Sequence, residues 1–508
     1  MTKIIKISAL AALVTSSLVG ADIDAKLSEM EAKINALQTQ LNQSNKTLTE
    51  VKAHDGNDNL KFGVDFRTSI DNIQYKQYGG GTASNPDLLT NRLWLTMGYE
   101  ATPNTLFKGK LSYLKAYGDS VSHSQSNIAG GSTNLQAFDW VTNENTGDSS
   151  LKVKEAYWLY KQDTLAGANI PWTMSIGRRP STDGLGINLR EGQKENSPLA
   201  HTVNVEFDGL SSKLDLDKVT GVQGMSWKLC TGRGLTNASP RFDMTNPAYA
   251  AASTTRNEIQ HDVNMYGFIF EPYNDGQYMV SSNWARADHL IGFDMGMGPG
   301  NPDFMNYMIL TDTSGQPTTT QVPTGYKFKD FGSLDLATVM FKADGIGSGI
   351  SDFLDNTTVF ASWAQSKTTP KNGMLMLGQP DSKTGTSIWF GAQIPCPLTK
   401  DGRIGVEWNK GSRWWRPVTY GEDTMAGSKL AARGTAVEVY YNKPIDKALS
   451  FNLRATKIKY DYAGSNAFFG EDGYAGTMAE ASGMATTFGM AQPVTEATDL
   501  KASISYRF

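Results

Sequence analysis

Segments in which apolar residues occupy every second position recur from residue 60 to the end of this chain. A two-residue period indicates a β-strand with two different faces. The clearest apolar sets are Phe62, Val64, Phe66 and Ile70; Leu93, Leu95, Met97 and Tyr99; Ile404, Val406 and Trp408; Val437, Val439 and Tyr441; and Leu449, Phe451 and Leu453. Further strands are expected near 106–117, 152–160, 172–179, 203–210, 222–231, 262–271, 277–286, 332–342, 356–365, 386–394 and 500–508. The total is about sixteen strands (14–18).

The links between these strands alternate between short and long, which is a sharper test than the strands themselves. Short links are predicted at 102–105, 272–276 and 443–447, and links of middling length near 161–171, 211–221, 343–355 and 395–402. Long links rich in turn-forming residues are predicted near 71–90, 118–151, 180–202, 232–261, 287–331, 366–385, 411–433 and 461–498. Short turns at one end and long loops at the other are typical of membrane β-barrels. Residues 60–508 are therefore predicted to form an all-β, transmembrane antiparallel barrel.

The composition agrees with a barrel better than with a set of soluble domains. The 508 residues would suit about three soluble domains of roughly 150 residues each. Yet only 39% of residues are apolar, and the mean hydropathy is −0.38. No later stretch approaches the ~20 apolar residues of a membrane helix. Half of each barrel strand faces water, which explains both values. The net charge of −4 argues against a dedicated nucleic-acid binder.

The last nine residues, LKASISYRF, divide cleanly into an apolar and a polar face. One parity carries Leu500, Ala502, Ile504, Tyr506 and Phe508, and the other carries Lys501, Ser503, Ser505 and Arg507. A terminal aromatic residue on such a strand resembles the signal that the barrel-assembly machinery reads in outer-membrane proteins, with Ile504, Tyr506 and Phe508 as its residues. The alternative is an ordinary edge strand of a soluble β-domain.

The N-terminus predicts export followed by a helix. Lys3 and Lys6 precede the apolar run 7–19, and Val19-Gly20-Ala21 is a small-residue cleavage site, so residues 1–21 are predicted to be a signal peptide. Residues 22–53 carry a heptad seam, which predicts a short periplasmic α-helical coiled coil before a linker at 54–59. The seam could support a homotrimer, or a single helix could lie against the barrel. Its residues are Leu27, Met30, Ile34, Leu37, Leu41 and Leu48.

Inward parity defines the candidate pore-lining residues. The basic ones are Lys61, Arg67, Arg92, Lys108, Lys110, Arg179, Arg403, Arg454 and Arg507, and the acidic ones are Asp65, Glu100, Asp335, Glu407 and Glu438. An excess of Arg and Lys favours anions in a pore. The alternative is that mixed charges merely solvate and brace the wall. The third long link, 180–202, is the candidate constriction loop, with Arg190, Glu191, Lys194 and Glu195; it could equally point outward.

The chain resembles the porins of Gram-negative bacteria and, more narrowly, a family of porin-like outer-membrane proteins of unknown function. The narrower resemblance rests on Ile176-Gly177-Arg178-Arg179-Pro180 followed by Asp183-Gly184-Leu185-Gly186, and on Phe207-Asp208-Gly209. It implies an outer-membrane location, with lipopolysaccharide and the assembly machinery as partners. It implies no particular permeant.

Three classes of function follow from these observations. The first is a porin for small hydrophilic solutes or ions, with a weak anion preference. The second is a surface adhesin or structural barrel acting through its long loops. An enzyme is the weakest, because the sequence has no G-x-S-x-G elbow, phosphate loop or zinc spacing. No cofactor, metal or nucleic-acid partner is expected. Cys230 and Cys396 are predicted to lie near opposite ends of the barrel and to be unpaired.

Overall fold

The computed structural model describes residues 60–118, 151–197, 199–235, 262–294, 327–420, 424–487 and 491–508. The chain divides into two units, Met1–Leu60 and Lys61–Phe508, and all described residues except Leu60 belong to the second. The predicted signal peptide, coiled-coil helix and linker therefore lie outside the described residues. Within the described residues, no helix is both long and apolar enough to cross a membrane.

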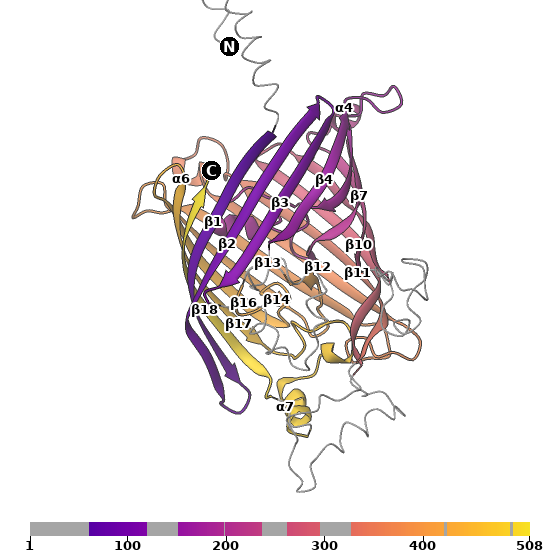
Figure 1. Ribbon diagram of the computed structural model, residues 1–508, viewed down its shortest axis with the longest axis vertical. Coiled ribbons are helices and arrows are strands. Elements are labelled where there is room, and N and C mark those ends of the chain that lie inside the picture. Colours follow the sequence, from indigo (N-terminus) through magenta and orange to yellow (C-terminus); the bar gives the residue numbers. More distant parts are fainter. Residues whose placement is uncertain are drawn as a thin grey trace, which may run out of the picture. The chain divides into compact units, whose positions relative to one another are not determined.

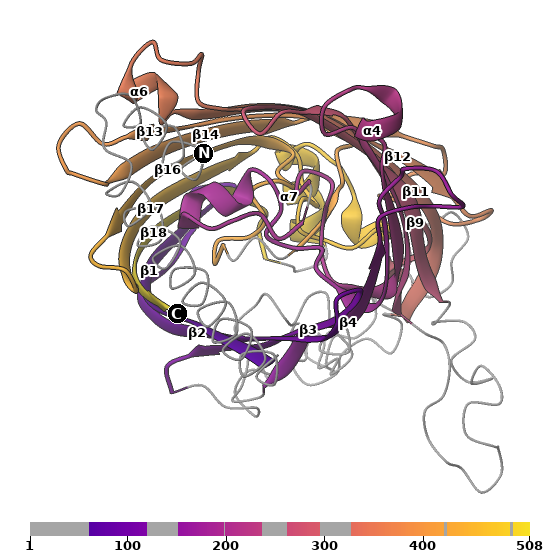
Figure 2. The same cartoon turned by 90° about the horizontal axis from the view of Figure 1, so that it is seen from above.

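Sixteen strands of the described chain close into one barrel in which every neighbouring pair is antiparallel (Figures 1 and 2). The predicted number of strands is confirmed. The strands are β1 (Leu60–Gln77), β2 (Thr82–Thr102), β3 (Thr105–Ala116), β4 (Lys152–Gln162), β5 (Trp172–Arg179), β7 (Phe207–Asp215), β8 (Ser226–Leu235), β9 (Val263–Asn274), β10 (Tyr278–Asp294), β11 (Lys327–Asp344), β12 (Thr358–Pro370), β13 (Thr384–Pro395), β14 (Arg403–Gly411), β16 (Gly434–Pro444), β17 (Leu449–Tyr460) and β18 (Val494–Arg507).

Short elements occupy the connections. A two-stranded parallel sheet joins β6 (Val203–Asn204) to β15 (Val418–Thr419). The helical elements among the described residues are η2 (Ile187–Glu191), α4 (Asp217–Thr220), α6 (Asp352–Asp355), η3 (Glu471–Gly473) and α7 (Met478–Thr487). We name four long connections by their order along the chain: the third loop (180–206), the sixth (371–383), the seventh (412–433) and the eighth (461–493).

The alternation of short and long connections is confirmed except between β1 and β2. The predicted short links fall between β2 and β3, between β9 and β10, and between β16 and β17. Figure 1 shows α4 and α6 at the upper end of the barrel with the short turns, and α7 at the lower end with the long loops. The long link predicted at 71–90 is wrong, because β1 continues to Gln77 and β2 already begins at Thr82. The polar residues at 71–77 and 82–90 therefore still belong to β1 and β2.

Strand β18 closes the barrel between β17 and β1, as its two faces predict. It pairs with β1 from Arg507 opposite Asp65 to Val494 opposite Gln77. Leu500, Ile504 and Tyr506 are exposed on the outer face. The inward side chains of the same strand are buried, among them Lys501, Ser503 and Ser505.

The inward assignment of Asp335 is wrong. Asp335 lies on the outer face of β11, where its carboxylate pairs with Arg286 of β10 at 2.8 Å. Leu334, Leu336 and Met340, which would face lipid in a barrel filled with water, are instead fully buried inside. The inversion has a physical cause: loops fill this side of the lumen with an apolar core, so the wall beneath them is apolar.

The two cysteines are free, as predicted, but not at opposite ends of the barrel. Cys230 lies in β8, five residues into the strand from the short-turn end, and Cys396 lies in the short turn after β13.

Candidate functional site

The lumen is the candidate functional site, and the third loop folds into it. Figure 2, viewed along the barrel, shows the short helix η2 of this loop inside the ring of strands. Side-chain amides from three strands fix the main chain of η2: Gln393 and Asn442 donate to the Leu189 carbonyl oxygen at 2.8 and 3.2 Å, and Asn452 donates to the Arg190 carbonyl oxygen at 2.8 Å. The loop is therefore bound to the wall at β13, β16 and β17.

Glu191 is the centre of an ionic anchor between the third loop and the wall. Its carboxylate lies 2.5 Å from the Arg67 guanidinium, 3.0 Å from that of Arg92 and 3.7 Å from that of Arg507. Arg507 also donates to the Glu191 carbonyl oxygen at 3.0 Å. Burial alone would raise the pKa of the Glu191 carboxyl, but Arg92, Arg67 and Arg507 hold it well below its usual range.

A second ionic cluster fixes Arg190 and the seventh loop. Lys429 of that loop donates to Glu407 of β14 at 2.7 Å and to Glu438 of β16 at 2.6 Å. Arg190 and Arg454 also approach the Glu438 carboxylate, at 3.7 and 4.0 Å. All five side chains are nearly inaccessible to water. Three cations share two carboxylates, so loss of either carboxylate would leave buried cations without a partner.

Smaller ion pairs continue along β3 and β4. Lys110 lies 2.5 Å from Glu155, and Lys154 lies 2.7 Å from Glu206 of the third loop. The indole of Trp94 lies beneath three cations, the nearest being Arg92 at 3.7 Å from the ring centroid. The pair of Lys154 and Glu206 holds the end of the third loop to the wall.

His201, near the end of the third loop, is buried and neutral. Its two ring nitrogens lie 2.8 Å from the Ser362 hydroxyl and 2.9 Å from the Ser387 hydroxyl. The ring contacts Trp389 and Trp415 edge to face. Burial lowers the pKa of His201 to about 3. It therefore acts as a packing and hydrogen-bonding residue rather than as a proton carrier near neutral pH.

On the far side of the ring, the loops pack through apolar side chains. One buried cluster joins inward residues of β9, β10 and β11 to residues of four loops: Val205 of the third, Met376 and Leu377 of the sixth, Val418 of the seventh, and Phe468 and Phe469 of the eighth. The wall residues include Ile291, Phe331, Leu334 and Leu336. We call this set the apolar cluster. It occupies the loop end of the lumen beside these strands.

The charges without an ionic partner are mostly cationic. Four predicted pore-lining cations form no ion pair with the described residues, namely Lys61, Lys108, Arg179 and Arg403. Among the predicted pore-lining acids, Glu100 alone forms no ion pair with the described residues. Arg403 instead donates to Gln393 at 2.7 Å and to the Asn356 carbonyl oxygen at 2.6 Å. Lys194 and Glu195 are exposed and contribute nothing to either ionic cluster.

A cavity of about 160 Å³ lies at the short-turn end between η2 and the wall. Its lining includes Arg67, Arg403, Lys443 and Arg507, with Glu191 and Asp401 as the acids. Four cations against two carboxylates give this mouth of the lumen a positive balance.

The sequence did not indicate several residues that organise the lumen. Lys429 was overlooked because it lies in a predicted loop, and Lys154, Glu155 and Glu206 because their partners are remote in the chain. The run Leu430-Ala431-Ala432 beside Lys429 was an available signal. Such an apolar run in an otherwise polar loop indicates burial, and all three residues are fully buried.

The model of a family described as a protein of unknown function, DUF3373, matches residues 82–508. The chain belongs to this family. No curated protein matches it. Among solved structures, OprB of Pseudomonas putida aligns with a TM-score of 0.47 at 13% identity, covering 90% of this chain and 96% of that chain. OmpF of Salmonella typhi aligns at 0.44 with 10% identity, covering 89% and 99%. OmpT, an outer membrane protein of Vibrio cholerae, aligns at 0.40 with 10% identity, covering 88% and 99%.

Proposed function

We propose that this porin-like barrel lies in the outer membrane of a Gram-negative bacterium and conducts small hydrophilic solutes and ions, with a weak preference for anions. The proposal rests chiefly on the excess of unpaired cations among the inward residues, together with the excess of cations over carboxylates at the mouth of the lumen.

The outer surface supports a membrane location. Large apolar side chains are exposed on strands all around the barrel, for example Phe66, Val339, Phe390 and Val437. Contact of this apolar surface with water would be unfavourable, whereas lipid chains solvate it.

A row of polar side chains marks the loop-side edge of that apolar surface. Cross-strand partners follow one another from Arg178 to Asp208, Arg233, Asn264 and Asp288. These polar side chains favour contact with lipopolysaccharide headgroups, because the headgroup phosphates accept hydrogen bonds from arginine. Further proposed partners are the barrel-assembly machinery, acting on Ile504, Tyr506 and Phe508, and two further copies of the chain in a trimer built on residues 22–53.

The ionic anchors explain why the anion preference is weak. Several inward cations, such as Arg67, Arg92 and Lys110, are neutralised by a carboxylate within 3.3 Å. Only unpaired groups contribute a net field to a passing ion, and they are few.

The test is a bilayer recording under a salt gradient, with Arg403→Gln as the variant. A charge several ångströms from a hydrated ion contributes less than about 1 kcal/mol in water, so the anion-to-cation permeability ratio should fall by roughly twofold. Lys459→Gln is the matched control, because Lys459 lies on the outer face of β17. Clear cation selectivity of the unmodified protein would refute the anion preference, and an absence of conductance would refute the channel.

The apolar cluster favours a second candidate, a structural barrel or adhesin with a closed lumen. Buried apolar side chains exclude water from the region that they occupy. In that case the protein would insert in the bilayer and show no unitary conductance, while its long loops would bind a surface.

A further inference from the structure

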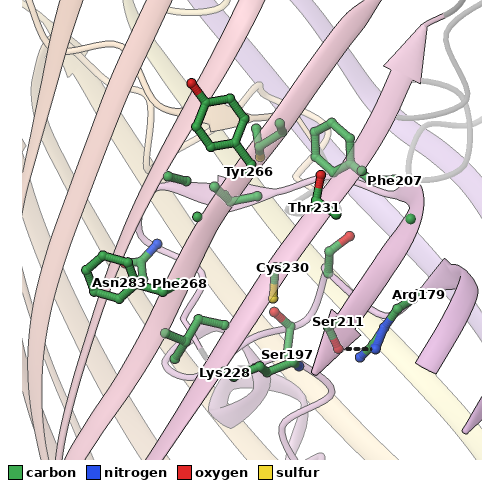
Figure 3. Close-up of a pocket in the computed structure, with 18 of the residues that line it drawn as sticks. Arg179, Ser197, Phe207, Ser211, Lys228, Cys230, Thr231, Tyr266, Phe268 and Asn283 are labelled. Carbon is green, nitrogen blue, oxygen red and sulfur yellow. Dashed lines mark hydrogen bonds between the residues drawn. The ribbon is translucent and has the colours of Figure 1, made fainter. Parts of the chain in front are cut away.

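Another cavity, of about 130 Å³, lies where the base of the third loop meets the inner faces of β7 to β10 (Figure 3). Most of its lining is apolar, and the side chains that contribute include Leu199, Val203, Phe207, Met265 and Ile269. Figure 3 shows Arg179 and Ser211 together at one edge, joined by a hydrogen bond.

The hollow exists because three inward positions of the wall are glycines. Gly209 of β7 pairs in register with Gly232 of β8, and Gly267 of β9 lies opposite Cys230. A Cβ atom on Gly209 would lie 2.0 Å from the Thr231 carbonyl oxygen, and one on Gly267 would lie 2.1 Å from that of Trp284. Both positions therefore require glycine, and the wall there stays bare.

The charge of the lining is unusual for this lumen. It contains Arg179 and Lys228 and no carboxylate. Arg179 donates to the Ser211 hydroxyl and lies 5.3 Å from the centre of the Tyr157 ring, but neither cation pairs with an acid of the described chain. By contrast, Lys154 and Lys429 each contact a carboxylate at 2.7 Å.

The size of the cavity matches one six-membered ring. An engineered apolar cavity of roughly 150 Å³ binds benzene, so a hollow of about 130 Å³ accommodates a ring or a short branched chain. An apolar body together with a positive edge that no carboxylate contacts fits a small organic anion.

We propose that this cavity binds a small aromatic carboxylate, with its ring against the apolar lining and its carboxylate at Arg179 and Lys228. That this anion is also a permeant of the barrel rests on the proposed channel function. Binding of the anion in the cavity does not depend on that function.

The two free cysteines allow a direct test, because Cys230 lines the cavity and Cys396 lies in a distant turn. Benzoate is the probe, and alkylation of each thiol by N-ethylmaleimide is followed by mass spectrometry on the full-length protein in detergent. Benzoate should slow alkylation of Cys230 in a saturable manner and leave Cys396 unchanged. Benzyl alcohol, which keeps the ring without the charge, should protect at least tenfold less well. Isothermal titration with benzoate gives a second readout that does not depend on thiol reactivity.

Two variants test the two halves of the site. Lys228→Met should weaken benzoate binding about tenfold, since a hydrogen bond to a charged group typically contributes that much. Ala285→Leu should abolish binding by filling the hollow. Lys213→Met is the matched control, because Lys213 lies on the adjacent strand, pairs with Asp215 and does not line the cavity.

The outcomes separate this inference from the proposed function. Equal protection of Cys230 by benzoate and benzyl alcohol would overturn the anion site. The site would also be overturned if benzoate neither protected Cys230 nor gave a heat of binding in the titration. A conducting barrel that binds no benzoate would leave the channel intact and refute the site. A barrel that binds benzoate without conducting would support the site and refute the channel.

Discussion

Opposite sides of the lumen hold their loops by different forces. Beside β1, β16 and β18, the third and seventh loops are held by ion pairs centred on Glu191 and Lys429. Beside β9, β10 and β11, which lie across the ring, the sixth and eighth loops are held by the apolar cluster. The first side depends on the charge state and geometry of a few groups, and the second on the area removed from water.

The difference indicates which side can change. A buried carboxylate that loses its charge or its partners leaves arginines desolvated and unpaired, so the anchor fails abruptly. An apolar contact is non-directional and tolerates small shifts. We therefore expect any adjustment of the width of the permeation path to occur on the ionic side, while the packing on the apolar side stays fixed.

The largest effect is expected from Glu191→Gln. The substitution leaves Arg67, Arg92 and Arg507 around a neutral amide, and removing one partner of a buried pair typically costs about 3–5 kcal/mol. The tip of the third loop should leave the wall, and the single-channel conductance should rise severalfold. Glu195→Gln is the matched control in the same loop, because Glu195 is exposed. An unchanged conductance would show that the anchored loop does not limit the path.

Phe469→Ala should have the next largest effect, on stability rather than on conduction. Phe469 is fully buried in the apolar cluster, and truncating a buried phenylalanine costs about 3–4 kcal/mol. Urea titration in lipid bilayers should report this loss, while the permeability ratio stays constant. Phe353→Ala, at an exposed position of α6, is the control. A change of ion selectivity in Phe469→Ala would show that the packing on the apolar side also controls permeation.

The architecture of the barrel was readable from the sequence because it depends on local patterns. The two faces of 500–508 and the short links at 102–105 and 443–447 all follow from side-chain alternation and turn chemistry. The ends of β1 and β2 were not readable, because polarity marks exposure to water and not the end of hydrogen bonding. A strand that extends beyond the lipid is polar on both faces.

The filling of the lumen could not be predicted from the same patterns. The interpretation of Asp335 as inward assumed that apolar residues face lipid, whereas Leu334 and Leu336 face the apolar cluster. That cluster unites residues from four loops and three strands that are far apart in the chain. Arg190 and Glu191 were identified as loop residues, but their partners Glu438, Arg67 and Arg92 depend on how the loop folds back.

The smallest effect is expected from pH at the edge of the apolar cluster. Asp472 of the eighth loop accepts hydrogen bonds from the main-chain nitrogens of Phe293 at 3.0 Å and Phe468 at 2.7 Å. Burial nevertheless raises the pKa of its carboxyl from 3.8 to about 6. Between these values the folded state holds a proton that the unfolded state has lost, so the free energy of unfolding falls as the pH rises. The fall should be roughly 2–3 kcal/mol in total and should end near pH 6.

Asp472→Asn isolates this contribution, because the amide cannot titrate. Urea titrations of both proteins at steps from pH 4 to pH 7 give the difference in their free energies of unfolding. The contributions of all other titratable groups are the same in both proteins and cancel in this difference. Glu191 contributes the opposite trend in both proteins, since a depressed pKa stabilises at higher pH and is lost as the pH falls below about 4.5. The ionic side should therefore loosen in acid while the eighth loop tightens. A difference that does not vary with pH would show that Asp472 is ionised in the folded barrel, held by its two main-chain donors and Arg416.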